Sequence, residues 1–390
     1  SILTGGEMFR ITTRSQVNKL LTILSVVGEF PFDSRGLLGS EGYFNNLIYK
    51  HTRPDDYSFS NSDKIIHGQL FQLAGKAELK SIRFHKTGLP ILKHLNPIAY
   101  QHYLDTYDNH HLRTTEDRII RNHRIAEATV MCMNAGIEAR PYIAPKLTKQ
   151  YHQEIPFTDP AFYLSKYLKK TDPDGFNKTK YARIVGALFY ETGCYSVYNL
   201  RDALMKWKPE SELKVRLDMT DICTMNTNQY DVQSTIFFCS SYQTGFRVLE
   251  EWKSNSDLRT LFTSVYKHVH FIPINEFGVQ LLQILTIPHW NERLLRLFFK
   301  NEYRSFGMGD MPYDAQMSGT YVLSFLDSDF ARLYLFRNNI GNFPDRKWLV
   351  LCFHHQAKFL REYLGSGVRL KVIPMAEVME KLKIKRREII

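Results

Sequence analysis

Apolar residues recur at helical spacing near the start of the chain. Between Ser15 and Phe30, valines and leucines return every three or four residues, and Ser15 is of a type preferred as a helix cap. A helix is therefore predicted from about residue 16. Residues 34–51 repeat the pattern more weakly because glycines interrupt it, and they predict a second helix. Residues 1–14 lack this periodicity and are expected to form a flexible lead.

The next segment predicts a third helix and a β-hairpin. Over residues 62–77 the isoleucines and leucines share one helical face, and two β-like runs follow at 78–84 and 89–95 around a short turn. Three helices and a two-stranded wing in this order are typical of a winged helix-turn-helix domain, here over residues 15–106. In such a domain the third helix enters the major groove of DNA and the wing contacts phosphates.

The remainder of the chain predicts an α/β architecture. Polar residues 107–118 are expected to be a linker, and residues 119–230 predict a helix and a hairpin that turns at Thr192 and Gly193. Residues 231–390 repeat a unit of one short apolar strand and one amphipathic helix, and they end in a basic tail. This alternation indicates a mostly parallel sheet covered by helices. The fold class expected for the whole chain is a multidomain α/β protein.

Composition and charge narrow the function classes. The 390 residues carry a formal net charge of +11, which favours a polyanionic partner such as nucleic acid. No stretch approaches the roughly 20 uncharged apolar residues that span a membrane, so neither membrane insertion nor a secretion signal is expected. The five cysteines are widely spaced and form no CxxC pair, which indicates buried reduced thiols. We expect a cytoplasmic protein.

The basic segment within residues 60–104 supplies the candidate DNA contacts. We expect the third helix to present Lys64, Gln72 and Lys76 to the groove, with His67 on its flank. Five further residues would meet phosphates: Lys80, Arg83, His85, Lys86 and Lys93. The competing interpretation is a solvated basic corner of an ordinary core.

These segments resemble a known family. The order of the elements in residues 60–104, the sequence LNPIAYQHYL after the wing, and the helix and strand over residues 118–143 are similar to the replication-relaxation family of plasmids and integrative elements. Ala99 departs from that family, which often has glycine there. The resemblance implies a winged helix followed by a Rossmann-like or degenerate PD-(D/E)xK nuclease core. The strand STIFFCSS has Asp231 before it but no ExK or DxK within it, which favours binding without cutting.

The leading hypothesis is therefore a non-enzymatic accessory protein for replication or transfer of a mobile element. It would bind duplex DNA without a cofactor, and would dock a relaxase, a helicase or a second copy of itself. One alternative is a metal-dependent HUH-type nickase, because His268 and His270 alternate on a predicted strand and would face one side. Another is a transcription regulator whose α/β region senses a ligand.

Overall fold

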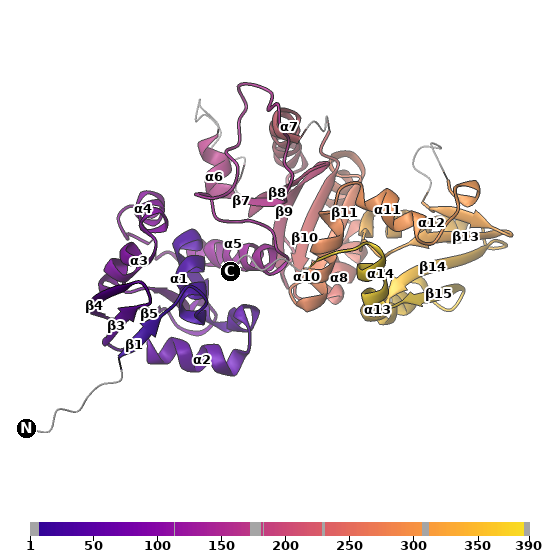
Figure 1. Ribbon diagram of the computed structural model, residues 1–390. Coiled ribbons are helices and arrows are strands. Elements are labelled where there is room, and N and C mark those ends of the chain that lie inside the picture. The colour runs from indigo at the N-terminus through magenta and orange to yellow at the C-terminus, as the bar shows by residue number, and fades with distance from the viewer. Residues whose placement is uncertain are drawn as a thin grey trace, which may run out of the picture. The chain divides into compact units, whose positions relative to one another are not determined.

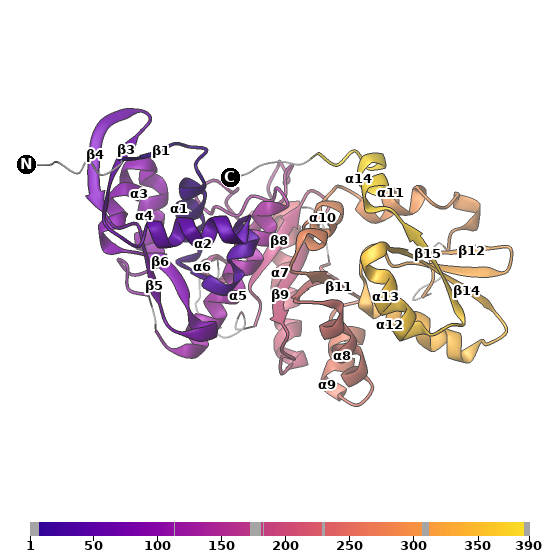
Figure 2. The same cartoon turned by 90° about the horizontal axis from the view of Figure 1, so that it is seen from below.

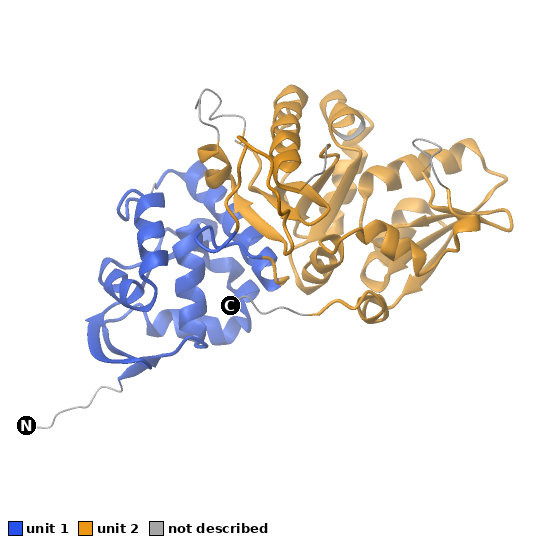
Figure 3. Ribbon diagram, turned by 45° about the horizontal axis from the view of Figure 1, so that its top comes forward, with its two compact units in different colours: residues 1–134, 138–144, 388–390 blue, residues 135–137, 145–387 orange. Residues whose placement is uncertain are grey.

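The chain divides into two compact units (Figure 3). The computed structural model describes residues 8–112, 114–171, 181, 183–227, 231–305 and 312–385. Unit 1 contains the described residues up to Asn134 together with Glu138–Ala144, and unit 2 contains Ala135–Ile137 and the described residues from Pro145 onward. Both units mix helices with strands, which confirms the expected multidomain α/β class.

Unit 1 interleaves short strands with α-helices and with short 3-10 helices, labelled η (Figure 1). Its elements are β1 (Phe9–Ile11), α1 (Gln16–Val27), β2 (Glu29–Pro31), η1 (Phe32–Leu38), α2 (Glu41–Lys50), β3 (Asp55–Phe59), β4 (Ser62–Gly68), β5 (Phe71–Ala74), η2 (Ala77–Leu79), β6 (Ser81–Phe84), η3 (Lys86–Gly88), α3 (Leu89–Leu95), α4 (Pro97–Thr106) and α5 (Glu116–Asn134).

Two small sheets organise unit 1. The first has the strand order β1-β3-β4, and the second has the order β2-β6-β5 with antiparallel pairing throughout. The tight turn after β5 depends on Gly75, whose φ of 81° lies in the left-handed region and whose missing Cβ would sit 2.5 Å from the carbonyl oxygen of Leu79. Helix α5 packs on β2 and α1, so its apolar face completes the core of this unit.

Several sequence predictions for this region are confirmed. Helix α1 begins behind Ser15, whose hydroxyl accepts a hydrogen bond from the backbone N–H of Asn18 at 3.3 Å. The second helix is formed by α2, and a helix begins at Pro97 as expected. The helix predicted from residue 118 is α5.

Other predictions for this region are wrong. The third helix expected over residues 62–77 is absent, because this segment forms the strands β4 and β5. The run at 89–95, expected as the second wing strand, is helix α3. Part of the expected flexible lead, Phe9–Ile11, is a strand that pairs with β3. The expected linker at 107–118 lies inside unit 1, because α5 packs on that unit. The strand predicted over 137–143 is not formed. Apart from a single β-bridge residue, Glu138, the segment is irregular and ends in a turn over 141–143.

Unit 2 holds two sheets (Figures 1 and 2). Its elements are β7 (Ala161–Leu164), α6 (Ser165–Lys170), β8 (Gly186–Tyr190), β9 (Gly193–Arg201), α7 (Pro209–Thr227), β10 (Ser234–Cys239), α8 (Tyr242–Trp252), α9 (Ser256–Thr260), the π-helical turn η4 (Leu261–Val265), β11 (His268–Pro273), α10 (Glu276–Leu285), α11 (Trp290–Arg296), η5 (Asn301–Tyr303), β12 (Ala315–Met317), β13 (Thr320–Ser324), α12 (Phe330–Asn342), β14 (Lys347–Phe353), α13 (His354–Leu364), β15 (Val368–Ile373) and α14 (Met375–Lys381).

The five predicted strand-and-helix units are all present, but they divide between the two sheets. The first sheet has the order β11-β10-β9-β8-β7, in which β9, β10 and β11 run parallel. The second has the order β12-β13-β14-β15, in which β13, β14 and β15 run parallel. The hairpin predicted about Thr192 and Gly193 is formed by β8 and β9. A single continuous parallel sheet is therefore replaced by two shorter ones.

An aromatic core joins the two sheets of unit 2. Tyr242 of α8, Phe271 of β11, Phe330 of α12 and Phe359 of α13 are buried and stack on one another. Gly245 of α8 allows this packing, because a Cβ there would lie 2.2 Å from the ring of Phe330. Among the described residues, no helix combines the length and the apolar character needed to cross a bilayer.

A buried ion pair stabilises the second sheet of unit 1. Arg83 on β6 faces Glu29 on β2, and its Nη2 lies 2.6 Å from Glu29 Oε2. Glu29 is fully buried and also accepts a hydrogen bond from Asn122 of α5 at 2.7 Å. Arg83 was expected to contact phosphate, but its partner and its burial give it a structural role.

We expect Arg83→Ala to lower the free energy of unfolding of unit 1 by about 3–5 kcal/mol, because it leaves Glu29 buried without a counter-charge. Cys132 is the cysteine of α5 and the other four cysteines lie in unit 2, so labelling of the Cys132 thiol during urea unfolding, followed by mass spectrometry, reports on unit 1. Lys86→Ala, at an exposed position, is the matched control. If the urea concentration at which Cys132 becomes half-labelled were equal for the two variants, the structural role of Arg83 would be contradicted.

Candidate nucleic-acid interface and a buried histidine–aspartate network

The nine residues expected to contact DNA lie on several elements of unit 1. Lys64 and His67 are exposed on β4, and His67 Nδ1 is 2.8 Å from Asp56 Oδ1. Gln72 lies half-buried on β5, where it pairs with Arg83. The helix that was to present Lys64, Gln72 and Lys76 together does not exist.

The remaining expected contacts differ in exposure. Lys76 is exposed in the turn between β5 and β6, and Lys86 is exposed in η3. Lys93 is exposed on α3, with its Nζ 5.6 Å from the centre of the Tyr100 ring. His85 caps η3, because its Nδ1 accepts from the backbone N–H of Thr87 at 3.3 Å. These side chains are therefore divided between a turn, a helix and a cap.

Helix α2 presents a polar and aromatic face that the sequence analysis did not select. Its buried side is formed by Phe44, Leu47 and Ile48, which leaves Tyr43 and Asn46 exposed on the other side. Tyr49 and Lys50 extend this exposed face toward the end of the helix. A signal was available, because the same periodicity that predicted the helix also predicts which residues point away from the core.

The β5–β6 hairpin lies beside this face of α2. Lys80, in the connection from β5 to β6, donates a hydrogen bond from Nζ to the hydroxyl of Tyr49 at 3.1 Å and lies 4.1 Å from the centre of the Phe32 ring. The exposed negative charge at the start of α2 is balanced, because Glu41 forms an ion pair with Arg35 at 2.7 Å. The surface formed by α2 and the hairpin is therefore polar, with lysines at its edge.

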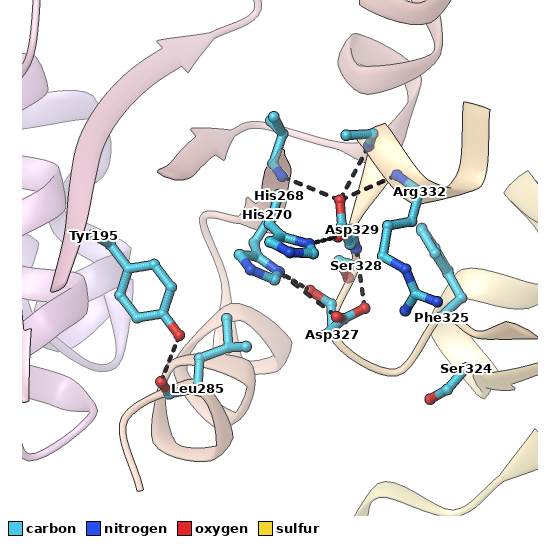
Figure 4. Close-up of polar contacts among 12 residues, drawn as sticks. Tyr195, His268, His270, Leu285, Ser324, Phe325, Asp327, Ser328, Asp329 and Arg332 are labelled. Atoms are coloured by element: carbon cyan, nitrogen blue, oxygen red, sulfur yellow. Dashed lines mark hydrogen bonds and ion pairs between the residues drawn. The ribbon is translucent and has the colours of Figure 1, made fainter. Parts of the chain in front are cut away.

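A second candidate site lies in unit 2, where β11 meets the loop after β13 (Figure 4). His268 and His270 lie on one side of β11 as predicted, with nearly parallel rings whose centres are 6.4 Å apart. The loop supplies Asp327, Ser328 and Asp329, and the backbone of the two segments is joined by a hydrogen bond from Phe271 N to Ser328 O at 3.0 Å.

Asp329 is the centre of this network. Its Oδ2 lies 2.8 Å from His268 Nδ1, and its Oδ1 accepts from the backbone N–H of Val269 at 3.1 Å and of Ala331 at 3.1 Å. Burial alone would raise the pKa of Asp329, but the hydrogen bond and the positive charge of His268 outweigh burial and hold it well below its usual value. Asp329 therefore caps α12 and links it to β11 as a carboxylate.

The two histidines differ in protonation. Burial tends to lower the pKa of His268, but the hydrogen bond and charge of Asp329 raise it above its usual value. Burial lowers the pKa of His270 to about 4, so its ring is neutral near pH 7. His270 Nδ1 donates to the carbonyl oxygen of Asp327 at 2.9 Å, while its buried Nε2 has no hydrogen-bond partner among the described residues.

Further charges complete the network. Burial and the negative charge of Asp329 raise the pKa of Asp327 to about 7. Arg332 of α12 lies next to these carboxylates and donates a hydrogen bond from Nη2 to Asp314 Oδ1 at 2.8 Å. The cluster thus balances buried carboxylates against one guanidinium and one protonated imidazole, and it joins the two sheets of unit 2.

Metal chemistry finds little support in this geometry. Each histidine uses its Nδ1 within the network, and the side chain of His268 is partly exposed whereas that of His270 is buried. In the part of the chain that the structure describes, no three His, Cys, Asp or Glu side chains are placed to hold a metal ion. Asp231, the acid considered for a nuclease, forms a two-pronged ion pair with Arg216 at 2.8 and 2.9 Å.

The charge excess is distributed unevenly along the chain. Residues 1–144 carry 17 Lys and Arg against 14 Asp and Glu, whereas residues 145–390 carry 34 against 26. Most of the positive charge therefore belongs to the second part of the sequence and not to the segment expected to bind DNA. No protein-family model matches the chain, and searches of curated proteins and of solved structures found no match.

The raised pKa of Asp327 predicts a pH dependence of stability. The folded protein holds the Asp327 proton more tightly than the unfolded chain, in which an aspartate titrates near 3.9, so this group costs stability as the pH rises from about 4 to about 7. Asp327→Asn keeps an acceptor for the backbone N–H of Asp329 and removes the titration.

We therefore expect Asp327→Asn to become more stable relative to the wild type as the pH is raised from 5 to about 8. Tryptophan fluorescence during urea unfolding reports on unit 2, because all four tryptophans lie there. Asp345→Asn, at an exposed position, should follow the wild-type curve. If the free energies of unfolding of the wild type and of Asp327→Asn changed with pH by the same amount, Asp327 would not titrate in this range.

Proposed function

We propose that this protein binds duplex DNA through unit 1, as a non-enzymatic accessory protein for replication or transfer of a mobile element. The observation that carries the proposal is the position of the exposed face of α2 beside the β5–β6 hairpin, to which Lys80 connects it. In this assignment α2 replaces the segment 62–77 as the helix that enters the major groove.

The arrangement of unit 1 supports this assignment. Helix α1 is followed by β2, then by the 3-10 helix η1 and helix α2, and later by the hairpin β5–β6, which pairs with β2 in one sheet. This is the order of a winged helix-turn-helix domain, with β3 and β4 inserted between the groove-binding helix and the wing. The β5–β6 hairpin is then the wing, with Gly75 and Lys76 at its tip.

The chemistry of the surface fits duplex DNA. An asparagine side chain can form two hydrogen bonds to adenine in the major groove, and Asn46 is exposed on α2. Lys50 and Lys76 are exposed on α2 and on the hairpin, and in this proposal they would contact phosphates. Tyr43 and Tyr49 can donate hydrogen bonds to phosphate from their hydroxyl groups.

Unit 2 is proposed to bind a protein partner. The resemblance to the replication-relaxation family implies that this region docks a relaxase, a helicase or a second copy of the chain. The greater excess of positive charge in residues 145–390 favours additional contacts with the DNA backbone. We propose these partners on the resemblance and the charge alone.

Substitutions on α2 and on the hairpin should affect DNA binding differently. Asn46→Ala should cost about 1–3 kcal/mol at a preferred site and little on random duplex, because it removes a base contact. Lys50→Ala and Lys76→Ala should weaken binding to the preferred site and to random duplex equally. Each should also lower the slope of log K for DNA binding against the logarithm of the salt concentration by about one unit. Fluorescence anisotropy over a series of salt concentrations measures both effects, on sites first selected from random duplexes.

Lys93→Ala provides the matched control, because Lys93 is an exposed lysine of α3. It should leave both affinity and salt dependence unchanged. A loss with Lys93→Ala but not with Lys50→Ala or Lys76→Ala would contradict the proposed surface. Supercoiled DNA incubated with the protein and Mn²⁺ should remain intact; nicking that His268→Gln abolishes would instead support the nickase alternative.

A further inference from the structure

A pocket of about 330 Å³ lies at the carboxyl ends of β10 and β11 in unit 2. It is lined by the segments that directly follow these two strands, 240–243 and 273–277, and by one face of α13. Ligand sites of parallel α/β sheets gather at this edge, where the loops after neighbouring strands diverge. None of the candidate residues considered above for DNA or metal binding lines this pocket.

Aromatic rings form one wall of the pocket. The ring of Phe277 stacks on that of His355, with centres 4.3 Å apart and planes 11° apart, and Tyr242 stacks on His355 at 5.7 Å. Burial lowers the pKa of His355 to about 4, so this wall is uncharged near pH 7. Phe277 is 44% exposed and therefore offers apolar ring surface to a ligand.

Hydrogen bonds to the loop after β13 fix the position of this aromatic wall. The hydroxyl of Tyr242 lies 2.6 Å from Ser328 Oγ, which also accepts a hydrogen bond from Gln356 Nε2 at 2.9 Å. Ser328 belongs to the loop that carries Asp327 and Asp329. A ligand would therefore meet a preorganised surface, which lowers the entropic cost of binding.

Two opposite charges stand at the same pocket. Lys358 and Glu362 both line it from α13, one helical turn apart, and both are exposed. They do not pair with each other, and within the described chain neither forms an ion pair with another residue. The order of a lysine followed four residues later by a glutamate is also the less favourable one for pairing along a helix. Each charge is thus available to a ligand.

We propose that this pocket binds a zwitterionic aromatic ligand of the size of an aromatic amino acid. The carboxylate of the ligand would lie against Lys358, its ammonium group against Glu362, and its ring on Phe277. A nucleotide fits less well, because its phosphate would approach Glu362 as well as Lys358. Such a ligand would bind to unit 2, whereas the surface proposed for DNA belongs to unit 1.

Isothermal titration of the full chain with three related compounds tests this assignment. L-Phenylalanine carries both charges, 3-phenylpropanoate lacks the ammonium group, and phenethylamine lacks the carboxylate. We expect L-phenylalanine to bind about threefold to fivefold more tightly than either of the others, because each of those lacks one charge-assisted contact and water screens contacts with exposed charges. L-Tryptophan should behave as L-phenylalanine does.

Each of two variants should abolish one of the two preferences shown by the wild type. Lys358→Met should abolish the preference for L-phenylalanine over phenethylamine and keep its preference over 3-phenylpropanoate. Glu362→Gln should do the reverse. Lys371→Met, at an exposed position on β15, is the control and should preserve both preferences.

Three results would overturn the proposal. They are the absence of binding of both amino acids at roughly 10 mM, equal affinity of the wild type for the three phenyl compounds, and tighter binding of adenosine monophosphate than of the amino acids. Because both charged residues are exposed, unchanged circular dichroism of the variants is expected and separates loss of binding from loss of folding.

Discussion

The ion pair between Glu29 and Arg83 fixes the part of unit 1 on which the proposed DNA surface depends. These residues face each other across β2 and β6, and Asn122 ties Glu29 to α5. A buried carboxylate tolerates no other position for the guanidinium, so the hairpin that carries β6 has a defined register. The hairpin in turn places Lys80 beside Tyr49 of α2. Two charges remote from any ligand thus position the surface that we assign to DNA.

An equivalent constraint operates in unit 2. The two sheets are not hydrogen-bonded into one, and the contact between β11 and the loop 327–329 replaces a continuous ladder. Asp329 serves this contact with both oxygens, since one binds His268 and the other accepts backbone N–H groups of β11 and α12. The histidine pair that suggested a nickase is therefore explained by the joint between the sheets. The same loop supports Tyr242 at the edge of the ligand pocket.

Periodicity in the sequence predicted the elements that bury one regular face, such as α1, α2 and α5, and all five strand-and-helix units of unit 2. It failed at residues 62–77, because Ile66 and Leu73 fit a helical spacing although they belong to the successive strands β4 and β5. The turn at Ser60 and Asn61 between β3 and β4 was the overlooked hairpin signal. The division of unit 2 into two sheets could not be predicted, because strand order depends on contacts between distant residues. The pocket was missed for the same reason, because it depends on which elements become neighbours. The exposed face of α2 follows from the helix periodicity, but its position beside the β5–β6 hairpin does not.

The most direct test of the central claim is site-specific photocrosslinking to duplex DNA. Tyr43 on α2 and Ile98 on α4 are both strongly exposed, with 52% and 65% of their surface accessible, and Figure 1 shows these two helices on different sides of unit 1. Benzoylphenylalanine placed at Tyr43 should crosslink to the DNA, whereas the same group at Ile98 should not. Crosslinking from position 98 with none from position 43 would contradict the assignment of α2 as the helix that enters the groove.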